Sequence, residues 1–143
     1  MSIPLKLQRI VDLFAAAPKE VKLQALLDYS KRLPPLPAEL LEHPDRMEQV
    51  HECQSAFFLA TEVAADGTVT PYFDSPMEAP TTRGYAGILS EGLSGATVAE
   101  ILAVPSDFYT AMGLEQVISP QRLRGMGAIL ARLKRQVGEA AGV

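Results

Sequence analysis

Residues 55–73 of the chain read SAFFLATEVAADGTVTPYF, and this stretch decides the fold class. Residues 55–63 are predicted to form a strand. Ala65-Asp66-Gly67 has the composition of a hairpin turn, so residues 68–73 are predicted to return antiparallel to the first strand. Pro71 has no N–H to donate, which predicts that the returning strand lies at an edge of the sheet. A third, short strand is predicted upstream, at residues 47–50.

The residues before this hairpin predict two helices. In the first, apolar residues recur at i, i+3, i+4 and i+7 and form one inward face: Leu7, Ile10, Val11 and Phe14. Pro18 suits the first turn of the second helix, whose inward face is predicted to consist of Leu23, Leu26, Leu27 and Leu33. The run Pro34-Pro35-Leu36-Pro37 ends that helix and begins an irregular stretch that extends to about Arg46.

The residues after the hairpin are predicted to be helical again. The expected helices span residues 81–91, 96–103, 107–112 and 120–137, with Ser106 and Ser119 as N-caps. The last helix has a narrow apolar stripe that consists of Leu123, Met126, Leu130, Leu133 and Val137. Helices on both sides of a hairpin predict an α+β fold, in which helices pack on one face of a small antiparallel sheet of about three strands. No linker divides the chain, so residues 1–143 are expected to form one domain.

Composition narrows the class of protein. The chain has 143 residues, of which 48% are hydrophobic and 21% charged, which is typical of a globular domain with one core. The longest apolar runs, residues 13–17 and 56–60, are too short to span a bilayer, and the amino terminus lacks the pattern of a signal peptide. One cysteine excludes an internal disulfide and favours a reducing cytoplasm. The basic last helix lacks interleaved aromatic residues, which argues against a nucleic-acid partner.

The chemical interest of the chain centres on Cys53, which follows Val50-His51-Glu52 and precedes Gln54-Ser55. It falls in the short connection between two predicted strands, a good position from which a nucleophile can meet a partner protein. On these residues alone, two interpretations stay open. A lone cysteine is often a small buried apolar residue, and an accessible thiol can equally be a nucleophile.

The segment around Cys53 resembles the signature of the SufE family, in which a Gly-Cys-Gln-Ser run leads into an aromatic-rich strand. Further similarity occurs, in the order found in that family, at Arg32-Leu33-Pro34-Pro35-Leu36, at Thr82-Arg83-Gly84-Tyr85-Ala86 and at Ile118-Ser119-Pro120-Gln121-Arg122-Leu123-Arg124-Gly125-Met126. No single motif is specific, but the ordered set covers nearly the whole chain from the second helix to the last.

The resemblance implies a fold similar to that of the IscU scaffold proteins and a role in sulfur transfer. In the SufE family, a cysteine accepts persulfide sulfur from a pyridoxal-phosphate-dependent cysteine desulfurase of the SufS type. It then passes the sulfur to a scaffold complex of the SufBCD type, which assembles iron–sulfur clusters. The acceptor in this chain would be Cys53. The resemblance implies no cofactor and no membrane, and a homodimer stays open.

The neighbours of Cys53 modify this expectation. Glu52 stands where the family usually has glycine, so a positive φ would be costlier there and a carboxylate would oppose thiolate formation. His51 would share the face of the thiol if the backbone stays extended, and it is a candidate catalytic residue. Gln54 and Ser55 are candidates for shaping the loop toward the partner.

Two arginines and a glycine complete the candidate site. Arg122 is expected in the first turn of the last helix, where a cation opposes the helix dipole by about 0.3–1 kcal/mol and needs a compensating partner. The family has an arginine at the matching place near the cysteine loop, which implies either a role in sulfur transfer or a structural role in bonding that loop. Arg83 is expected to position a loop or to pair with Asp74 or Glu78, and Gly84 to permit a close backbone approach.

Other functions have weaker support in the sequence. His43, Asp45, His51 and Cys53 are acceptable zinc ligands, but their spacing matches no established site, so no metal is expected. The alternative to a sulfur carrier is a redox sensor or small thiol enzyme that uses Cys53 with His51. A plain interaction module with a structural cysteine is a third hypothesis. Whether the protein is an enzyme is left open, and an accessory role is favoured.

Overall fold

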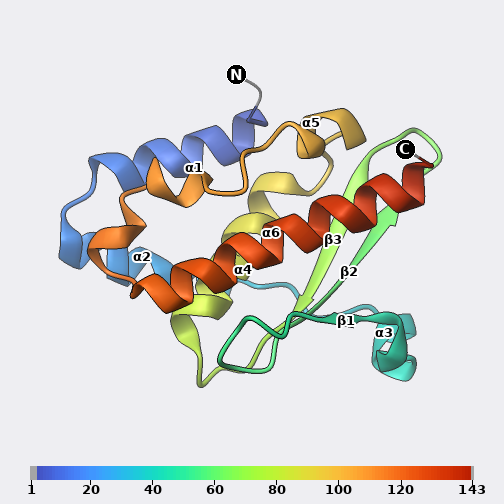
Figure 1. The fold of residues 1–143 in the computed structure, drawn as a ribbon, viewed down its shortest axis with the longest axis horizontal. Helices are drawn as coiled ribbons and strands as arrows, with labels where there is room; N and C mark the ends of the chain where they lie inside the picture. The colour runs from blue at the N-terminus through green and yellow to red at the C-terminus, as the bar shows by residue number, and fades with distance from the viewer. Residues whose placement is uncertain (1–2, 143) are drawn as a thin grey trace.

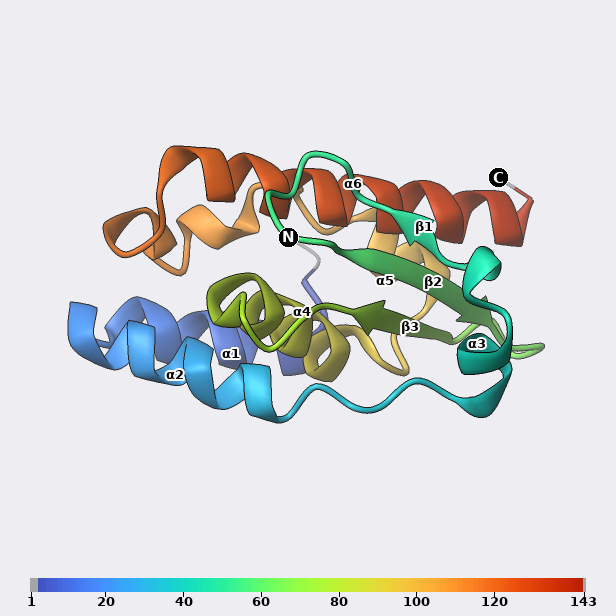
Figure 2. The ribbon, with the colours of Figure 1, turned by 90° about the horizontal axis from the view of Figure 1, so that it is seen from below.

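The computed structural model describes residues 3–142, which form an α+β fold (Figure 1). In chain order, its elements are α1 (Leu5–Ala16), α2 (Lys19–Lys31), α3 (Ala38–Glu42), β1 (Glu48–Gln49), β2 (Phe58–Val63), β3 (Val69–Asp74), α4 (Pro80–Leu93), α5 (Val98–Leu102) and α6 (Pro120–Ala141), with 3₁₀ turns at Pro44–Arg46, Phe108–Thr110 and Leu114–Gln116. Helices α1, α2 and α4 pack together, and α6 runs along β2 (Figures 1 and 2). The predicted fold class, helices on a three-stranded antiparallel sheet, is confirmed.

The sheet has the strand order β1-β2-β3, and both pairs are antiparallel. Leu59 of β2 lies opposite Phe73 of β3, and both are buried on the face that the helices cover. The next pair, Ala60 and Tyr72, points the other way and is half-buried. Pro71 lies on β3, an edge strand, as predicted, so its missing N–H leaves no gap in the ladder.

Helix α4 is the centre of the helical layer and is buried over most of its length. A Cβ at Gly84 would overlap the carbonyl oxygen of Leu26 and lie 2.9 Å from its carbonyl carbon. Gly87 meets the backbone of Tyr29 in the same way. The missing side chains therefore allow the backbones of α2 and α4 to touch. The close backbone approach expected at Gly84 is present, and α2 is its partner.

The inward face of α2 differs from the prediction. Leu26 and Leu33 are buried and Leu27 is half-buried, but Leu23 is 41% exposed, so its predicted place in the core is wrong. Lys22 is buried in its stead and donates from Nζ to the carbonyl oxygen of Ala17 at 2.5 Å. The lysine stem covers apolar surface while its ammonium bonds to the end of α1. The buried face of α2 thus starts at position 22 rather than 23.

Several boundaries also differ. The stretch expected to be irregular contains α3 and a 3₁₀ turn, and residues 107–112 form a 3₁₀ turn rather than an α-helix. Ser119 caps α6 as predicted, because its hydroxyl accepts a hydrogen bond from the backbone N–H of Arg122. Ser106 caps no helix, since Asp107 occupies the position before the turn and makes no side-chain cap bond. Strand β2 begins at Phe58, three residues later than predicted, because residues 51–55 form turns.

No helix within residues 3–142 combines the length and the apolar character that crossing a bilayer requires.

Candidate functional site

Cys53 lies in a turn, residues 51–55, that joins β1 to β2. The base of this turn continues the sheet, since the backbone N–H of Val50 donates to the carbonyl oxygen of Phe57 at 2.8 Å. Both Val50 and Phe57 are fully buried. Within the turn, the N–H of Cys53 donates back to the carbonyl oxygen of Val50 at 3.2 Å. The segment 51–55, called the cysteine loop below, is therefore a short excursion from a fixed base.

The cysteine loop rests on α6 at a glycine. The Sγ atom of Cys53 lies 4.0 Å from the carbonyl oxygen of Gly125, toward which the thiol can donate a weak hydrogen bond. A Cβ at Gly125 would stand 3.3 Å from Sγ, closer than ordinary contact. Glycine at this position lets the half-buried thiol settle against the helix. Gly125 belongs to one of the segments that resemble the family, but the sequence contains no signal that it faces the cysteine.

The environment of the thiol opposes its ionisation. Burial is the largest cause, the neighbouring carboxylate of Glu52 adds to it, and the guanidinium of Arg132 opposes both. Together they raise the pKa of the Cys53 thiol to about 11. At pH 7 about one thiol in ten thousand is then a thiolate. Cys53 is a weak nucleophile in this conformation.

A cavity of about 200 Å³ opens beside Cys53. Its walls come from the cysteine loop, the start of α4 with the residues before it, and the first turns of α6. The lining residues are Glu52, Cys53, Gln54, Ser55, Glu78, Ala79, Pro80, Thr82, Gln121, Arg122 and Gly125. Four of the candidate residues from the sequence, Glu52, Gln54, Ser55 and Arg122, thus meet around the thiol.

Arg122 is exposed in the first turn of α6 and forms part of the cavity wall. Its Nη1 donates to the hydroxyl of Thr81, at the start of α4, over 3.0 Å. Among residues 3–142, no carboxylate lies within ion-pair distance of its guanidinium. The compensating partner expected for Arg122 is therefore a neutral hydroxyl, which leaves N–H groups of the guanidinium for an anion.

Arg83 and Gly84 do not line the cavity. Arg83 donates from Nε to the carbonyl oxygen of Ser30 at 2.8 Å and from Nη1 to that of Ser75. It joins the end of α2 to the segment between β3 and α4, and makes no pair with Asp74 or Glu78. The segment between β3 and α4 continues into the cavity wall. Arg83 therefore makes no direct contact with the cavity and affects it only by holding the backbone of that segment.

His51 is exposed and does not line the cavity. Its expected position on the same face as the thiol required an extended backbone, and the structure has a turn there. Glu52 adopts no positive φ, since no non-glycine residue among 3–142 does. Glutamate is therefore accommodated in place of glycine without backbone strain.

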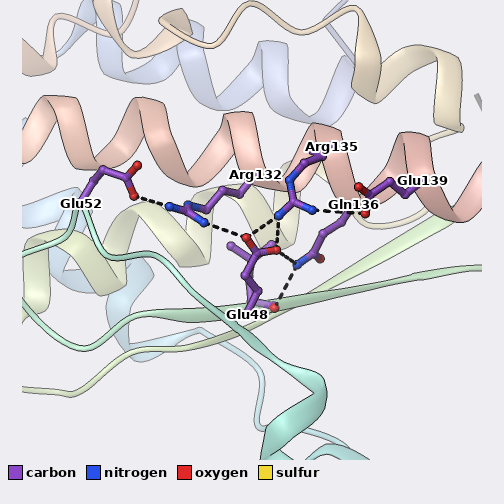
Figure 3. A network of polar contacts seen from close by, with 7 residues as sticks. Glu48, Glu52, Arg132, Arg135, Gln136 and Glu139 are labelled. Atoms are coloured by element: carbon purple, nitrogen blue, oxygen red, sulfur yellow. Dashed lines mark hydrogen bonds and ion pairs between the residues drawn. The ribbon is translucent and has the colours of Figure 1, made fainter.

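The carboxylate of Glu52 turns away to α6, where its Oε1 accepts from Nη2 of Arg132 at 2.8 Å (Figure 3). Sequence reasoning did not single out Arg132. The two residues are far apart in the chain, and the only signal was their opposite charge. Arg132 also bonds Glu48 of β1, so one guanidinium joins the strand, the loop and the helix.

Among residues 3–142, no three histidine, cysteine or carboxylate side chains come together as metal ligands. His43, Asp45, His51 and Cys53 therefore do not form a zinc site in this conformation.

Comparison with known proteins assigns the family. The family model of the SufE Fe–S metabolism associated domain matches residues 8–137. An uncharacterized SufE-like protein of Mycobacterium tuberculosis is 49% identical over 139 residues, which cover 97% of this chain and 96% of that protein. The cysteine desulfuration protein SufE of Plasmodium falciparum is 28% identical over 133 residues, which cover 90% of this chain and 52% of that protein.

A solved structure has the same fold. The solution structure of a hypothetical protein from Thermus thermophilus superimposes with a TM-score of 0.87 at 42% sequence identity, and the match covers 99% of both chains. The sequence motifs, the fold and the match over most of the chain agree with one another. The chain belongs to the SufE family of domains associated with Fe–S metabolism.

Proposed function

We propose that this protein is a sulfur carrier, in which Cys53 accepts a persulfide sulfur from a cysteine desulfurase of the SufS type. The observation that supports it best is the position of the only cysteine in a SufE-family chain. Cys53 lies on a loop, beside a cavity of about 200 Å³ that also contains Arg122. A scaffold complex of the SufBCD type, which builds iron–sulfur clusters, is the proposed acceptor of the sulfur. The cytoplasm is the proposed location of this carrier.

The proposed transfer is a thiol–disulfide exchange. The thiolate of Cys53 attacks the terminal sulfur of a persulfide on the desulfurase. A new S–S bond forms at Cys53, the S–S bond to the desulfurase cysteine breaks, and that cysteine leaves as a thiolate. It takes up the proton that Cys53 has lost, so no external oxidant or reductant is needed. The pyridoxal phosphate that first cleaves the carbon–sulfur bond belongs to the desulfurase.

Having one cysteine protects the product. A second thiol near Cys53 would attack the new persulfide, expel sulfide and leave a disulfide. The chain has no second cysteine, so this loss cannot occur within one molecule. The cavity has room for the added sulfur, and Arg122 supplies a guanidinium near its negative charge. Gln54 and Ser55 are the polar neighbours proposed to contact the partner.

The raised pKa of Cys53 assigns a role to the partner. Burial is the largest cause of the shift, so moving the thiol away from α6 into a polar environment lowers its pKa. Docking of the desulfurase is proposed to move the thiol in this way. Until then, the half-buried thiol of the free carrier is unreactive toward other sulfur compounds. The alternative, a redox sensor or thiol enzyme that uses His51, needs an activated thiol. The pKa of about 11 and the absence of His51 from the cavity wall argue against it.

Desulfurase turnover tests this proposal. The rate of alanine formation from cysteine is measured with the cognate desulfurase, with and without the protein, in the absence of other thiols. The wild type is expected to increase the rate, because Cys53 removes the sulfur that blocks the next turnover. Cys53→Ser, which retains the shape of the side chain, is expected to give no increase. If both proteins leave the rate unchanged, the proposed function is wrong.

A further inference from the structure

A network of charged side chains joins the cysteine loop to α6 and to the sheet (Figure 3). Arg132 of α6 lies between two carboxylates: its Nη1 donates to Glu48 of β1 at 2.7 Å, and its Nη2 donates to Glu52 of the loop at 2.8 Å. The planar guanidinium suits this bridge, because its N–H groups point in fixed, divergent directions. One residue thus holds the sheet with one nitrogen and the cysteine loop with another.

The two carboxylates are held very differently. Glu48 receives hydrogen bonds from Arg132, Arg135 and Gln136, and its side chain is 27% exposed. Glu52 has only Arg132 as a side-chain partner among residues 3–142, and its side chain is 50% exposed. Breaking the bond to Glu52 therefore leaves Glu48 fully bonded. Glu48 is the fixed end of the bridge, and Glu52 is the end that can separate.

We propose that Arg132 is a positioning residue: it holds the cysteine loop closed on α6 through Glu52 and remains on β1 through Glu48 when the loop opens. This is a regulatory feature of the same site, and its purpose rests on the proposed function. A partner that opens the loop breaks one half-exposed ion pair, and Arg132 keeps a partner throughout.

This arrangement predicts how Cys53 reactivity responds to mutation. The charge of Arg132 lowers the thiol pKa, so loss of that charge by itself would slow alkylation of Cys53. Loss of the loop contact has the opposite effect, because the reagent meets the thiol more often. The direction of the change in alkylation rate in Arg132→Gln therefore tells which effect of Arg132 is larger. A faster rate indicates that it holds the loop, and a slower rate indicates that it acts mainly through its charge on the thiol.

The experiment measures the rate at which iodoacetamide alkylates Cys53 at one fixed pH, in low and in high salt. Half-exposed ion pairs are weak, so Arg132→Gln and Glu52→Gln are each expected to raise the low-salt rate about 1.5- to 5-fold. Salt should accelerate the wild type and have little further effect on these variants. Arg132→Lys, which keeps the charge but loses the fork, is expected to lie between wild type and Arg132→Gln.

Arg135→Gln is the matched control. Arg135 lies on the same helix and bonds Glu48 and Glu139, but not the loop residue Glu52. Its removal should leave the alkylation rate within the error of the wild type. Hydrogen exchange of residues 51–55 and of α4 distinguishes local opening, which raises exchange in the loop alone, from loss of the whole fold.

The proposal is overturned if folded Arg132→Gln reacts at or below the wild-type rate, or if Arg135→Gln accelerates the reaction equally. Should Arg132→Gln fail to fold, hydrogen exchange of Glu52→Gln decides, because this variant also removes a charge that raises the thiol pKa: unchanged exchange in residues 51–55 contradicts the proposal. No desulfurase is present in these measurements. The result therefore stands or fails independently of the proposed sulfur transfer.

Discussion

Among the contacts that bring another segment against a glycine in a helix, those at Gly84 and Gly125 differ in what surrounds them. Gly84 of α4 meets the backbone of Leu26 on α2, and both helices are anchored in the core. Gly125 of α6 meets Cys53, which lies on a half-buried turn held by a backbone hydrogen bond and an ion pair at Glu52. A Cβ would overlap backbone in the first contact and approach a side-chain sulfur in the second.

The comparison distinguishes a rigid scaffold, which includes the α2–α4 contact, from a movable functional segment, the cysteine loop. At α2–α4, neither backbone can retreat without disturbing buried side chains, because interiors are close-packed. At the cysteine loop, the stem is fixed at Val50 and Phe57, and the turn beyond it has few buried contacts. Segments of this kind open locally at lower free energy than the core does. The fold thus presents Cys53 on a rigid base, and residues 51–55 can move without disturbing the core.

The most direct way to break the scaffold contact is Gly84→Ala. The new methyl group has no space next to the carbonyl of Leu26, so the free energy of unfolding should fall by about 3 kcal/mol or more. Thermal melting measures it. The control is Gly127→Ala on α6, whose Cβ would have no neighbour nearer than 3.9 Å. That variant should gain about 0.5–1 kcal/mol from helix propensity, and an equal loss in both would refute the distinction.

Glu48 lies at the boundary between scaffold and loop. Burial would raise its pKa, but hydrogen bonds from Gln136, Arg132 and Arg135 outweigh burial and lower it to about 2. Glu48→Gln should therefore reduce the free energy of unfolding at pH 7 by about 1.5–3 kcal/mol. Glu139→Gln, which removes only an exposed partner of Arg135, should change it by less than about 0.5 kcal/mol.

The difference in the free energy of unfolding between wild type and Glu48→Gln should depend on pH with a defined sign. The native carboxylate of Glu48 has a lower pKa than the unfolded one, whose ordinary value is 4.5. Its stabilisation is thus fully present above about pH 4.5 and disappears as the pH falls toward about 2. Denaturant unfolding of wild type and Glu48→Gln at several pH values measures it. A gap that stays constant from pH 7 to the acid limit would show that the charge of Glu48 contributes nothing.

Gly125→Ala tests the loop contact. The methyl group would press on Sγ, and the loop can yield by a few tenths of an ångström, so stability should change by less than about 1 kcal/mol. If the strain on the closed loop is about 0.5–1 kcal/mol, alkylation of Cys53 rises about two- to fivefold. The rate with iodoacetamide measures this change. A loss of stability as large as that of Gly84→Ala would mean that the loop is as rigid as the scaffold.

Arg122 should affect stability least. Its guanidinium is exposed and bonds only the hydroxyl of Thr81 among residues 3–142, so Arg122→Ala should change the free energy of unfolding by less than about 0.5 kcal/mol. The rate of persulfide transfer should fall about three- to tenfold, and the affinity for the desulfurase should change less. The effect on the rate is smaller than the loss of a buried charged hydrogen bond would give, because Arg122 is exposed.

Arg124→Ala, on the same turn but outside the cavity wall, is the control for Arg122→Ala and should transfer sulfur normally. Melting temperature, affinity and transfer rate are measured on both variants. A stable Arg122→Ala protein with an unaltered transfer rate would leave Arg122 without a role in the reaction.

Much of the fold could be predicted because its signals are local. The spacing of Leu7, Ile10, Val11 and Phe14 lies within one helix, and Asp66-Gly67 marks its own turn, where Gly67 has a φ of +86°. The place of Leu23 could not be predicted. Which side of α2 is buried depends on the rotation that its contact with α4 allows, and that contact is set by Gly84 and Gly87.

The site shows the same difference between local signals, which the sequence contains, and long-range packing, which it does not reveal. Cys53, Gln54 and Ser55 are adjacent in the chain, so a motif was enough to single them out. Gly125 and Arg132 are more than 70 residues away from the loop and reach it only because α6 runs along β2. The sequence contains their identities but not that packing. His51, two residues before Cys53, could be expected beside the thiol on an extended backbone, but the turn at residues 51–55 leaves it outside the cavity wall.

The central claim is that Cys53 receives sulfur from a desulfurase, and intact mass tests it most directly. The protein is incubated with its cognate desulfurase and free cysteine, and the mass is recorded without added reductant, which would strip a persulfide. The account predicts a gain of one sulfur atom on the wild type and none on Cys53→Ser. An unchanged wild-type mass in the presence of an active cognate desulfurase would contradict it.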